Sequence, residues 1–288
     1  MKLSFIIISY KSDHLLNNLL NKISKKHEVI VIENSLQKKT KHKIEKKFKN
    51  SKVIIPSKNL GYASAFNKAF KLSKNNFLIT LTPDVVINKK LILQIEILIH
   101  RFKNFHLMAP EYRNQKIYRN FTPISNSKSM FKIYRHEIIA VKEIDWCFCI
   151  LNKKKFKSSQ ILDENFFLYF ETMDLCKRLY KNKKKMYVIK NLKFHHLGTS
   201  SSNKKYNFEI KINRNWHFSW SKFYFYKKNY SYLFALKKIL PNIYQSLLGI
   251  VLCSLLLRFK DTRLHFSSLK GLISSVALMK SYFRLNLD

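Results

Sequence analysis

The chain has 288 residues, of which 46% are hydrophobic and 14% aromatic, so it can bury a large core and lacks the composition of a disordered protein. Its 55 Lys and Arg outnumber its 17 Asp and Glu, and the formal charge of +38 favours anionic partners: nucleotides, sugar phosphates, nucleic acid or an anionic membrane face. The lysines are spread along the chain and form no single tract, so compositional bias accounts for much of this charge.

Glycine and cysteine are scarce, and their positions exclude several kinds of site. The four glycines lack the spacing of a GxGxxG dinucleotide loop or a GxxxxGK[ST] phosphate loop, so any nucleotide is held by other means. The four cysteines form no CxxC pair, which disfavours a zinc site or a disulfide framework and fits a reducing compartment. Because acids are few, each carboxylate at the end of a strand is informative.

Short apolar runs alternate with amphipathic segments over the first hundred residues. The apolar runs are typical of buried strands and cover residues 3–9, 29–32, 53–55, 77–81 and 105–108. The segments between them have helical spacing and cover residues 15–23, 41–48, 63–72 and 91–102. This alternation predicts a parallel sheet with helices on both faces.

The pattern weakens between residues 110 and 142, where Asn, Ser, Thr and Pro mix with basic residues. We expect a loop-rich, partly exposed insertion there, of the kind that contacts an acceptor or forms a lid. Residues 144–151 are apolar again, apart from Asp145-Trp146, and a further strand is expected at residues 186–189. Beyond Asn213 the chain is helical and aromatic in character, without further strands.

Residues 239–257 form a largely apolar stretch with three interpretations. The uninterrupted part, residues 247–257 apart from Ser254, is shorter than the roughly 20 residues of a spanning helix. Besides a membrane-spanning helix, the interpretations are an ordinary packed helix and an amphipathic helix on a membrane surface. The basic residues that flank the stretch suit an interfacial helix; they are Lys237, Lys238, Arg258 and Lys260.

Polar residues follow several of the predicted strands. Because the carboxyl ends of parallel strands share one edge of a sheet, such residues can converge on a ligand. Asp84, directly after a buried strand, suits Mg²⁺ or Mn²⁺, although Pro83-Asp84 could equally make a turn and cap a helix that begins near Asn88. His196 could pack at the end of a strand or meet a phosphate or metal.

Glu171 and Asp174 lie three residues apart at the start of a predicted helix. One interpretation is structural, with Asp174 pairing with Arg178 one turn later. The other is functional, with one of the two carboxylates acting as a general base beside a substrate hydroxyl.

Six segments together resemble the family 2 glycosyltransferases with the GT-A fold, and the rhamnosyltransferase-like branch most closely. They occur in the family's order and spacing within residues 1–225, and they are ISYKS (8–12), VIVIENS (29–35), NLGYASAFNKAF (59–70), LTPDV (81–85), LDENFFLYFETMDLCKRL (162–179) and HHLGTSS (195–201). The resemblance implies an α/β fold with a mostly parallel central sheet flanked by helices. On this basis residues 1–225 form the GT-A domain, and residues 226–288 form a helical, basic and aromatic extension.

The resemblance also implies an inverting transfer from a nucleotide-sugar donor. The residues it assigns to donor binding are Ser9, Tyr10, Glu33, Asn59, Gly61, Ala63, Asn67 and Asp84. Asp84 and His196 would hold Mg²⁺ or Mn²⁺ at the diphosphate, and Asp145 and Trp146 are assigned to the acceptor. A carboxylate base would deprotonate the acceptor hydroxyl, which attacks the anomeric carbon.

Two departures from the family pattern affect these assignments. The DxD-like motif reads Thr82-Pro83-Asp84, so Asp84 is its single carboxylate and metal binding is expected to be weak. The motif that carries the base has Thr172 in the usual place, and since threonine is no base at neutral pH, we assign the role to Glu171, with Asp174 orienting or capping. An inactive relative that serves as a scaffold is the alternative.

The partners expected for such an enzyme are a UDP-, dTDP- or GDP-sugar donor, a glycan or polyprenyl-linked acceptor, and an anionic membrane surface. We therefore expect a cytoplasmic protein, peripheral on the inner face of the cytoplasmic membrane, that functions in surface polysaccharide synthesis. A nucleic-acid-binding module is disfavoured, because the sequence has no helix-turn-helix, zinc module or aromatic RNA-binding consensus.

Overall fold

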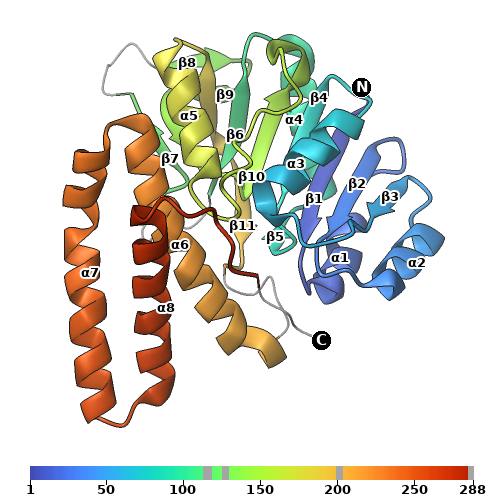
Figure 1. Cartoon of the computed structure of the whole chain (residues 1–288). Helices are drawn as coiled ribbons and strands as arrows, with labels where there is room; N and C mark the ends of the chain where they lie inside the picture. The colour runs from blue at the N-terminus through green and yellow to red at the C-terminus, as the bar shows by residue number, and fades with distance from the viewer. Residues whose placement is uncertain (113–118, 125–129, 199–203, 285–288) are drawn as a thin grey trace. The chain divides into compact units, whose positions relative to one another are not determined.

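The computed structural model describes residues 1–112, 119–124, 130–198 and 204–284, which fold into two compact units (Figure 1). The first unit comprises Met1–Leu60, Ala65–Leu162 and Leu175–Asn203. The second comprises Gly61–Ser64, Asp163–Asp174 and Lys204–Asp288. Two helices, α3 (Gly61–Leu72) and α5 (Glu171–Lys181), start with residues of the second unit and continue with residues of the first.

The N-terminal half of the first unit has the predicted alternation. Its strands lie in the order β3-β2-β1-β4 and all pair in parallel; they are β1 (Ser4–Ser9), β2 (Glu28–Glu33), β3 (Ser51–Ile54) and β4 (Phe77–Leu81). The helices that follow these strands are α1 (Asp13–Leu20), α2 (Lys38–Lys47), α3 and α4 (Lys89–Arg101). The predicted helices and strands are confirmed, with ends that differ by a few residues.

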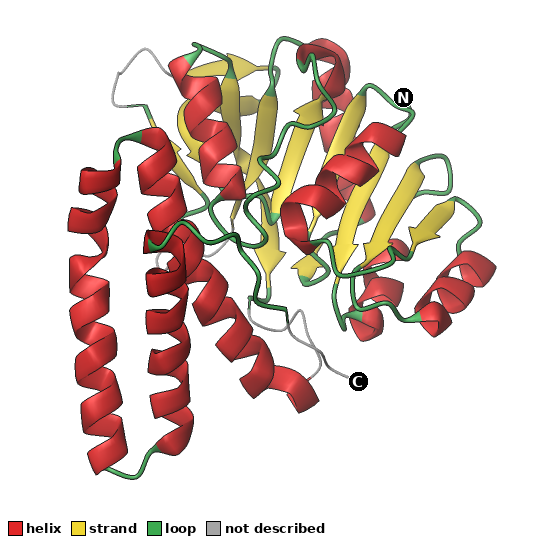
Figure 2. Ribbon diagram, in the orientation of Figure 1, coloured by secondary structure: helices red, strands yellow, loops and turns green. Residues whose placement is uncertain are grey.

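The other half of the sheet is mixed (Figure 2). Strand β10 (Phe148–Asn152) runs antiparallel between β4 and β6 (Leu107–Tyr112), and β11 (Met186–His196) runs parallel to β6. The remaining strands pair antiparallel: β5 (Val85–Val86) and β9 (His136–Ile144) with β11, and β7 (Phe121–Pro123) and β8 (Met130–Ile133) with β9. A short 3₁₀ turn, η2 (Lys153–Lys155), follows β10. The GT-A-like α/β class is confirmed, but the expectation of a mostly parallel sheet is wrong. Strands β1 to β4 and the pair of β6 and β11 are parallel, and the other strand pairs are antiparallel.

The expectation of a loop-rich insertion over residues 110–142 is wrong for the part that the structure describes. Strands β7 and β8 and most of β9 lie there, and residues 113–118 and 125–129 are outside the described ranges. In β9 buried residues such as Ile138 and Val141 are interspersed with more exposed polar ones, because part of the strand packs against the core. The basic and polar residues on the accessible side of these strands give the sequence the composition of a loop, which explains the wrong prediction.

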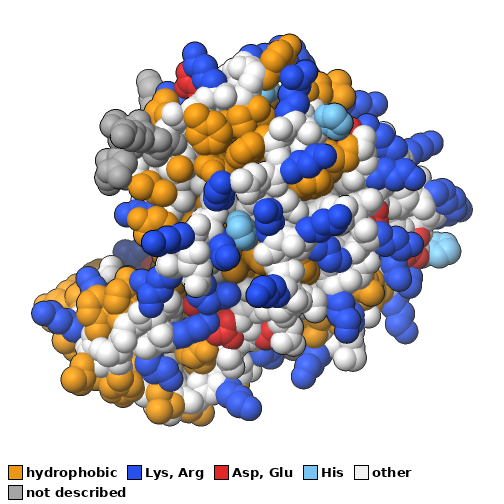
Figure 3. Space-filling view, turned by 90° about the horizontal axis from the view of Figure 1, so that it is seen from above, with side chains coloured by type: hydrophobic (Ala, Val, Ile, Leu, Met, Phe, Trp, Pro, Cys, Tyr) orange, Lys and Arg blue, Asp and Glu red, His pale blue; other side chains and the backbone are white. Residues whose placement is uncertain are grey.

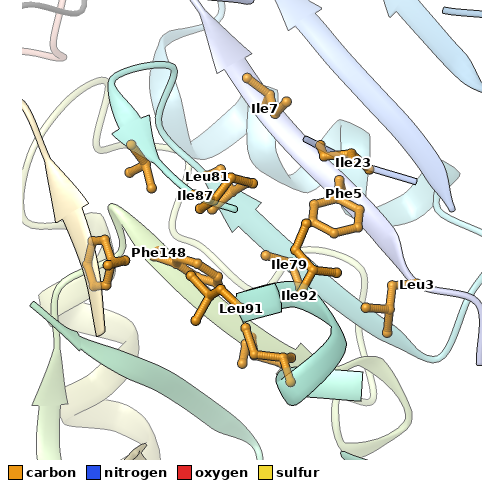
Figure 4. Packing of buried hydrophobic residues seen from close by; sticks show 14 of the residues in the cluster. Leu3, Phe5, Ile7, Ile23, Ile79, Leu81, Ile87, Leu91, Ile92 and Phe148 are labelled. Atoms are coloured by element: carbon orange, nitrogen blue, oxygen red, sulfur yellow. The ribbon is translucent and has the colours of Figure 1, made fainter. Parts of the chain in front are cut away.

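The hydrophobic core holds the carboxyl ends of the strands in place (Figure 4). Side chains of β1 and β4 meet those of α4 and β10, and the residues that Figure 4 labels are Leu3, Phe5, Ile7, Ile23, Ile79, Leu81, Ile87, Leu91, Ile92 and Phe148. Phe5, Ile79 and Phe148 are completely buried. Such packing is rigid, so the polar residues just past each strand have defined positions.

The second unit is helical, as predicted beyond Asn213. A 3₁₀ turn, η3 (Lys204–Tyr206), leads into α6 (Asn207–Asn229), which is followed by α7 (Tyr232–Leu255) and α8 (Phe259–Val276). Phe223, Ala235, Ile239 and Leu272 from these three helices form a small buried cluster. Gly271 allows a close approach, because a Cβ atom there would lie 2.3 Å from the carbonyl oxygen of Trp216.

Candidate active site

The carboxyl ends of β1 and β2 bring three predicted donor residues together. Ser9 and Glu33 are register partners, and both are buried. The backbone N–H and the hydroxyl of Ser35 donate to the same Glu33 oxygen, the former at 2.9 Å. Burial raises the pKa of Glu33, although the Ser35 hydrogen bonds work against this shift. Burial, and then the charge of Glu33, raise the pKa of Tyr10. This edge offers a carboxylate acceptor and a phenol for the hydroxyl groups of a nucleoside.

The turn before α3 is tied to the same edge. The backbone N–H of Leu60 donates to the side-chain oxygen of Asn34 at 3.4 Å, which places Asn59 next to the end of β2. Asn34, which is 3% exposed, is not among the predicted site residues. Its signal in the sequence is that of a polar residue directly after a buried strand.

Gly61 has a backbone conformation and an environment that exclude a side chain. Its φ is +73°, and a Cβ atom would lie 2.3 Å from the carbonyl oxygen of Phe167. The same oxygen accepts a hydrogen bond from the N–H of Tyr62 at 2.7 Å. The start of α3 and the segment before α5, both parts of the second unit, are joined by this contact. Ala63, one position further, is completely buried.

We expect Gly61→Ala to destabilise the protein by about 2–4 kcal/mol, because the added methyl group combines left-handed strain with a clash against backbone. For a chain of this size that corresponds to a fall in Tm of about 3–7 °C, measurable by circular dichroism. Gly198→Ala is the matched control. Gly198 also has positive φ (+57°), but its Cβ would meet nothing within 4 Å, so only about 1 kcal/mol of strain is expected. Equal losses in the two variants would contradict the contact with Phe167.

Asn67 has a structural role in this fold. Its side-chain amide donates to the carbonyl of Leu162 at 2.9 Å, and its side-chain oxygen accepts from the N–H of Leu162 at 3.1 Å. The residue is 4% exposed. Both ends of the carboxamide bind the backbone, which disfavours the predicted direct contact with a donor and indicates that Asn67 fixes the approach to α5.

Asp84 is paired with His196, as expected for the predicted metal site. The Nε2 atom of His196 and Oδ1 of Asp84 are 3.1 Å apart, and Asp84 is 4% exposed. Pairing of β5 with the end of β11 brings the two together, with Val85 opposite His196. The alternative that Asp84 caps the next helix is wrong, because the side chain of Asn88 caps α4 by accepting from the N–H of Leu91 at 2.8 Å.

The charges of this pair reinforce each other. Burial alone would raise the pKa of Asp84, but the hydrogen bond and charge of His196 outweigh it, and the pKa is lowered. Burial would lower the pKa of His196, but Asp84 outweighs it, with a smaller contribution from Asp145, and the pKa is raised. Asp84 is therefore held as a carboxylate, the form that binds a divalent cation.

Asp145 lies on the chain segment opposite Asp84. Leu81 and Phe148 are register partners in the antiparallel pair of β4 and β10, and the N–H of Thr82 donates to the carbonyl of Cys147 at 3.0 Å. The charge of Asp145 also contributes to raising the pKa of His196, so Asp145 lies near the Asp84–His196 pair. Trp146, the residue after Asp145, is 3% exposed and packs edge-on against Phe66, with ring centroids 5.2 Å apart. This burial disfavours the predicted acceptor contact of Trp146.

The start of α5 carries the candidate base. Tyr169 and Phe170, directly before it, have φ of 70° and 66°, a conformation that is strained for such residues. Glu171 is 6% exposed and Asp174 is completely buried. Asp174 accepts from Lys228 at 2.8 Å and from Asn229 at 3.0 Å. Strain of this kind is often concentrated where a side chain must be aimed at a substrate.

The contacts of Asp174 differ from the predicted pairing with Arg178. Arg178 donates to the carbonyl of Ile161 at 2.7 Å, while Lys228 bridges Asp174 and Asp163, both at 2.8 Å. No sequence signal could have identified Lys228, because it lies 54 residues from Asp174. Asp174 therefore anchors the start of α5 within the second unit, which agrees with an orienting role.

The predicted residues thus form three groups. Ser9, Tyr10 and Glu33 lie at one strand edge, Asp84 and His196 pair with Asp145 nearby, and Glu171 and Asp174 begin α5. Among the described residues, no group of three or more His, Cys, Asp or Glu side chains is placed to hold a metal ion. A divalent cation at Asp84 and His196 would need further oxygen ligands, which a diphosphate can supply.

A mixed α/β sheet with polar motifs at the carboxyl ends of its strands, and an acid–histidine pair among them, has the architecture of the GT-A glycosyltransferases. The chain belongs to glycosyl transferase family 2, whose family model matches residues 4–159. The curated relative found is the "Low-salt glycan biosynthesis hexosyltransferase Agl10" of Haloferax volcanii, 25% identical over 193 residues. This match covers 61% of the chain and 61% of the relative, so the chain spans less than two thirds of that relative's length.

Solved structures share the fold at low sequence identity. A mannosyltransferase from Pyrobaculum calidifontis in complex with GDP-Man and Mn²⁺ has a TM-score of 0.55 at 9% identity, over 95% of this chain and 86% of that one. S. aureus TarS (1–349) in complex with UDP-GlcNAc has a TM-score of 0.52 at 17% identity, over 99% and 94%. At such identities the likeness shows the fold alone.

Proposed function

We propose that this protein transfers a hexose or deoxyhexose from a nucleoside-diphosphate donor to a hydroxyl group of a glycan or lipid-linked glycan. The observation that carries the proposal is the buried Asp84–His196 pair, held by the pairing of β5 with β11 at a strand end. The order of the family motifs around this pair supports it. The relative's role in glycan biosynthesis supports a glycan acceptor, and the two donor complexes support a nucleotide sugar.

The protein's own groups suit an inverting displacement. Ser9, Tyr10 and Glu33 would bind the nucleoside, and Asp84 with His196 would hold Mg²⁺ or Mn²⁺. The cation, when bound, would neutralise the diphosphate as it leaves. Glu171 would accept the proton of the acceptor hydroxyl while the hydroxyl oxygen attacks the anomeric carbon, and the bond from that carbon to the diphosphate oxygen would break.

Donor binding is the first test of this function. Purified protein with Mn²⁺ should be stabilised by one class among UDP-, dTDP- and GDP-sugars, dTDP-rhamnose included because of the rhamnosyltransferase-like motifs. At a donor concentration of about 100 times Kd the gain is about 2.7 kcal/mol, or about 4–5 °C in Tm. Stabilisation without donor hydrolysis or transfer would favour the scaffold alternative that Thr82 and Thr172 suggest. No stabilisation by any of these sugars would reject the function.

A further inference from the structure

Helix α7 exposes a continuous apolar face. Leu240, Tyr244, Leu247, Val251 and Leu255 recur every three or four residues and are 48–75% exposed; we call them the α7 stripe. Residues at this spacing lie on one face of a helix. In the turn to α8, Leu256 and Leu257 are 66% and 72% exposed, and Phe259, the first residue of α8, is 65% exposed. A contiguous apolar surface of this kind marks an interaction site.

The charges around the stripe identify the partner. Residues 239–257 carry no charged side chain, whereas Lys237 and Lys238 precede them and Arg258 and Lys260 follow. From residue 231 to residue 284 there are eight Lys or Arg and a single acid, Asp261, which is paired with Arg258 at 2.7 Å. Two copies of this segment would repel each other, while an anionic lipid surface complements both the apolar stripe and its basic ends.

Basic charge is diffuse on the face of the molecule that Figure 3 shows. Lys and Arg side chains are scattered over this face and form no single patch there. The combination of an exposed apolar stripe with basic residues at both of its ends is the more specific feature, and it belongs to α7 and the turn after it.

The stripe suits the surface of a bilayer better than its interior. Among the described residues, α7 is the one helix with the length and composition of a membrane span, and 11% of its most apolar window is buried. However, α8 packs along it: Gly249 of α7 lies so close to His265 of α8 that a Cβ atom would be 2.5 Å from the ring. Spanning would take the charged residues of α8 into hydrocarbon with α7, at several kcal/mol for each.

We propose that the α7 stripe binds the surface of an anionic lipid bilayer, with α7 lying in the interface and Lys237, Lys238, Arg258 and Lys260 at the level of the headgroups. The long stems of these basic residues can follow the apolar face while their charges stay in water. An enzyme held in this way would meet a lipid-linked acceptor at the surface where the acceptor is anchored.

Co-sedimentation with vesicles tests the proposal on the full chain. The protein should bind vesicles of equal parts phosphatidylglycerol and phosphatidylcholine, and bind vesicles of phosphatidylcholine alone much more weakly. The triple variant Leu247→Gln, Val251→Gln, Leu255→Gln should weaken binding on the order of a hundredfold, because three apolar side chains lose their transfer out of water. Lys237→Gln and Lys238→Gln should each weaken it about fivefold.

A matched control variant makes three apolar-to-Gln changes at exposed positions outside α7. It combines Leu72→Gln, Leu93→Gln and Ile97→Gln, which replace residues that are 41–53% exposed on α3 and α4, and it should bind vesicles like the unmodified protein. Vesicle binding unchanged by the stripe variant, or absent from the unmodified protein, would overturn the proposal. So would resistance of the bound protein to alkaline extraction, which indicates spanning, or a stripe-dependent dimer in the ultracentrifuge. Donor stabilisation is measured without vesicles, so failure here leaves the proposed activity untouched.

Discussion

Asp84→Asn is expected to lower sugar transfer on the order of a hundredfold or more and to remove the dependence of donor binding on Mn²⁺. The substitution keeps the shape of the side chain but removes its charge, and charge at the diphosphate is stabilised most in a buried, pre-organised site. Asp84 is 4% exposed and hydrogen-bonded to His196 at 3.1 Å, so the substituted side chain should keep its position. Turnover as a function of Mn²⁺ concentration, together with the thermal shift by donor, measures both effects.

Glu137→Gln is the matched control for Asp84→Asn. It makes the same change from acid to amide at a surface residue, whose carboxylate is 3.4 Å from Lys190 and 37% exposed. An exposed ion pair contributes little to stability, so both turnover and Mn²⁺ dependence should stay as in the unmodified protein. If Asp84→Asn transferred sugar at the unmodified rate with the same response to Mn²⁺, the assigned role of Asp84 would be rejected.

The architecture was largely predictable from local pattern, and the site only in part. Buried strands and amphipathic helices alternate in residues 1–101, so periodicity alone predicted β1 to β4 and the helices between them. The pairing of Asp84 with His196 depends on β5 meeting β11, a contact across 112 residues. Local pattern left both residues with two interpretations. The order of family motifs favours metal binding for Asp84, and this role stays a prediction.

Where prediction failed, the cause was contact between distant parts of the chain. Residues 130–142 were predicted to be loop because the side chains of β8 are largely exposed and β9 carries exposed polar side chains beside buried ones, and only their pairing shows them to be strands. Trp146 is predicted to contact an acceptor, and only the structure shows that its ring packs in the core against Phe66, which disfavours that contact. Nothing near Asp174 in sequence indicates Lys228, which arrives from α6. Side chains with satisfied partners can be distinguished from those aimed at a ligand only in three dimensions.

Replacing each of the two acids at the start of α5 with its amide is expected to have different effects on activity and stability. Glu171→Gln is expected to lower transfer about 10²–10⁴-fold, since the amide cannot accept the proton of the acceptor hydroxyl, while donor binding and Tm stay unchanged. Asp174→Asn should act on stability first. Asp174 is completely buried against Lys228 and Asn229, and removing its charge leaves Lys228 with one of its two carboxylate partners. Because Lys228 is 29% exposed and keeps Asp163, the loss is that of a charge-assisted hydrogen bond, about 1.5–3 kcal/mol.

Measuring the Glu171→Gln and Asp174→Asn variants side by side distinguishes a catalytic base from a structural anchor. Thermal melts, donor binding by thermal shift, and turnover with donor and acceptor are recorded for each variant. Lys228→Met provides a second perturbation of the anchor, and it should reproduce the loss of Tm seen with Asp174→Asn because it breaks the same contact from the α6 side. The assignment fails if Glu171→Gln melts early with normal turnover. It fails also if Asp174→Asn abolishes turnover at unchanged Tm, since that result would move the base one turn along α5, from the strained entry of the helix to its buried side.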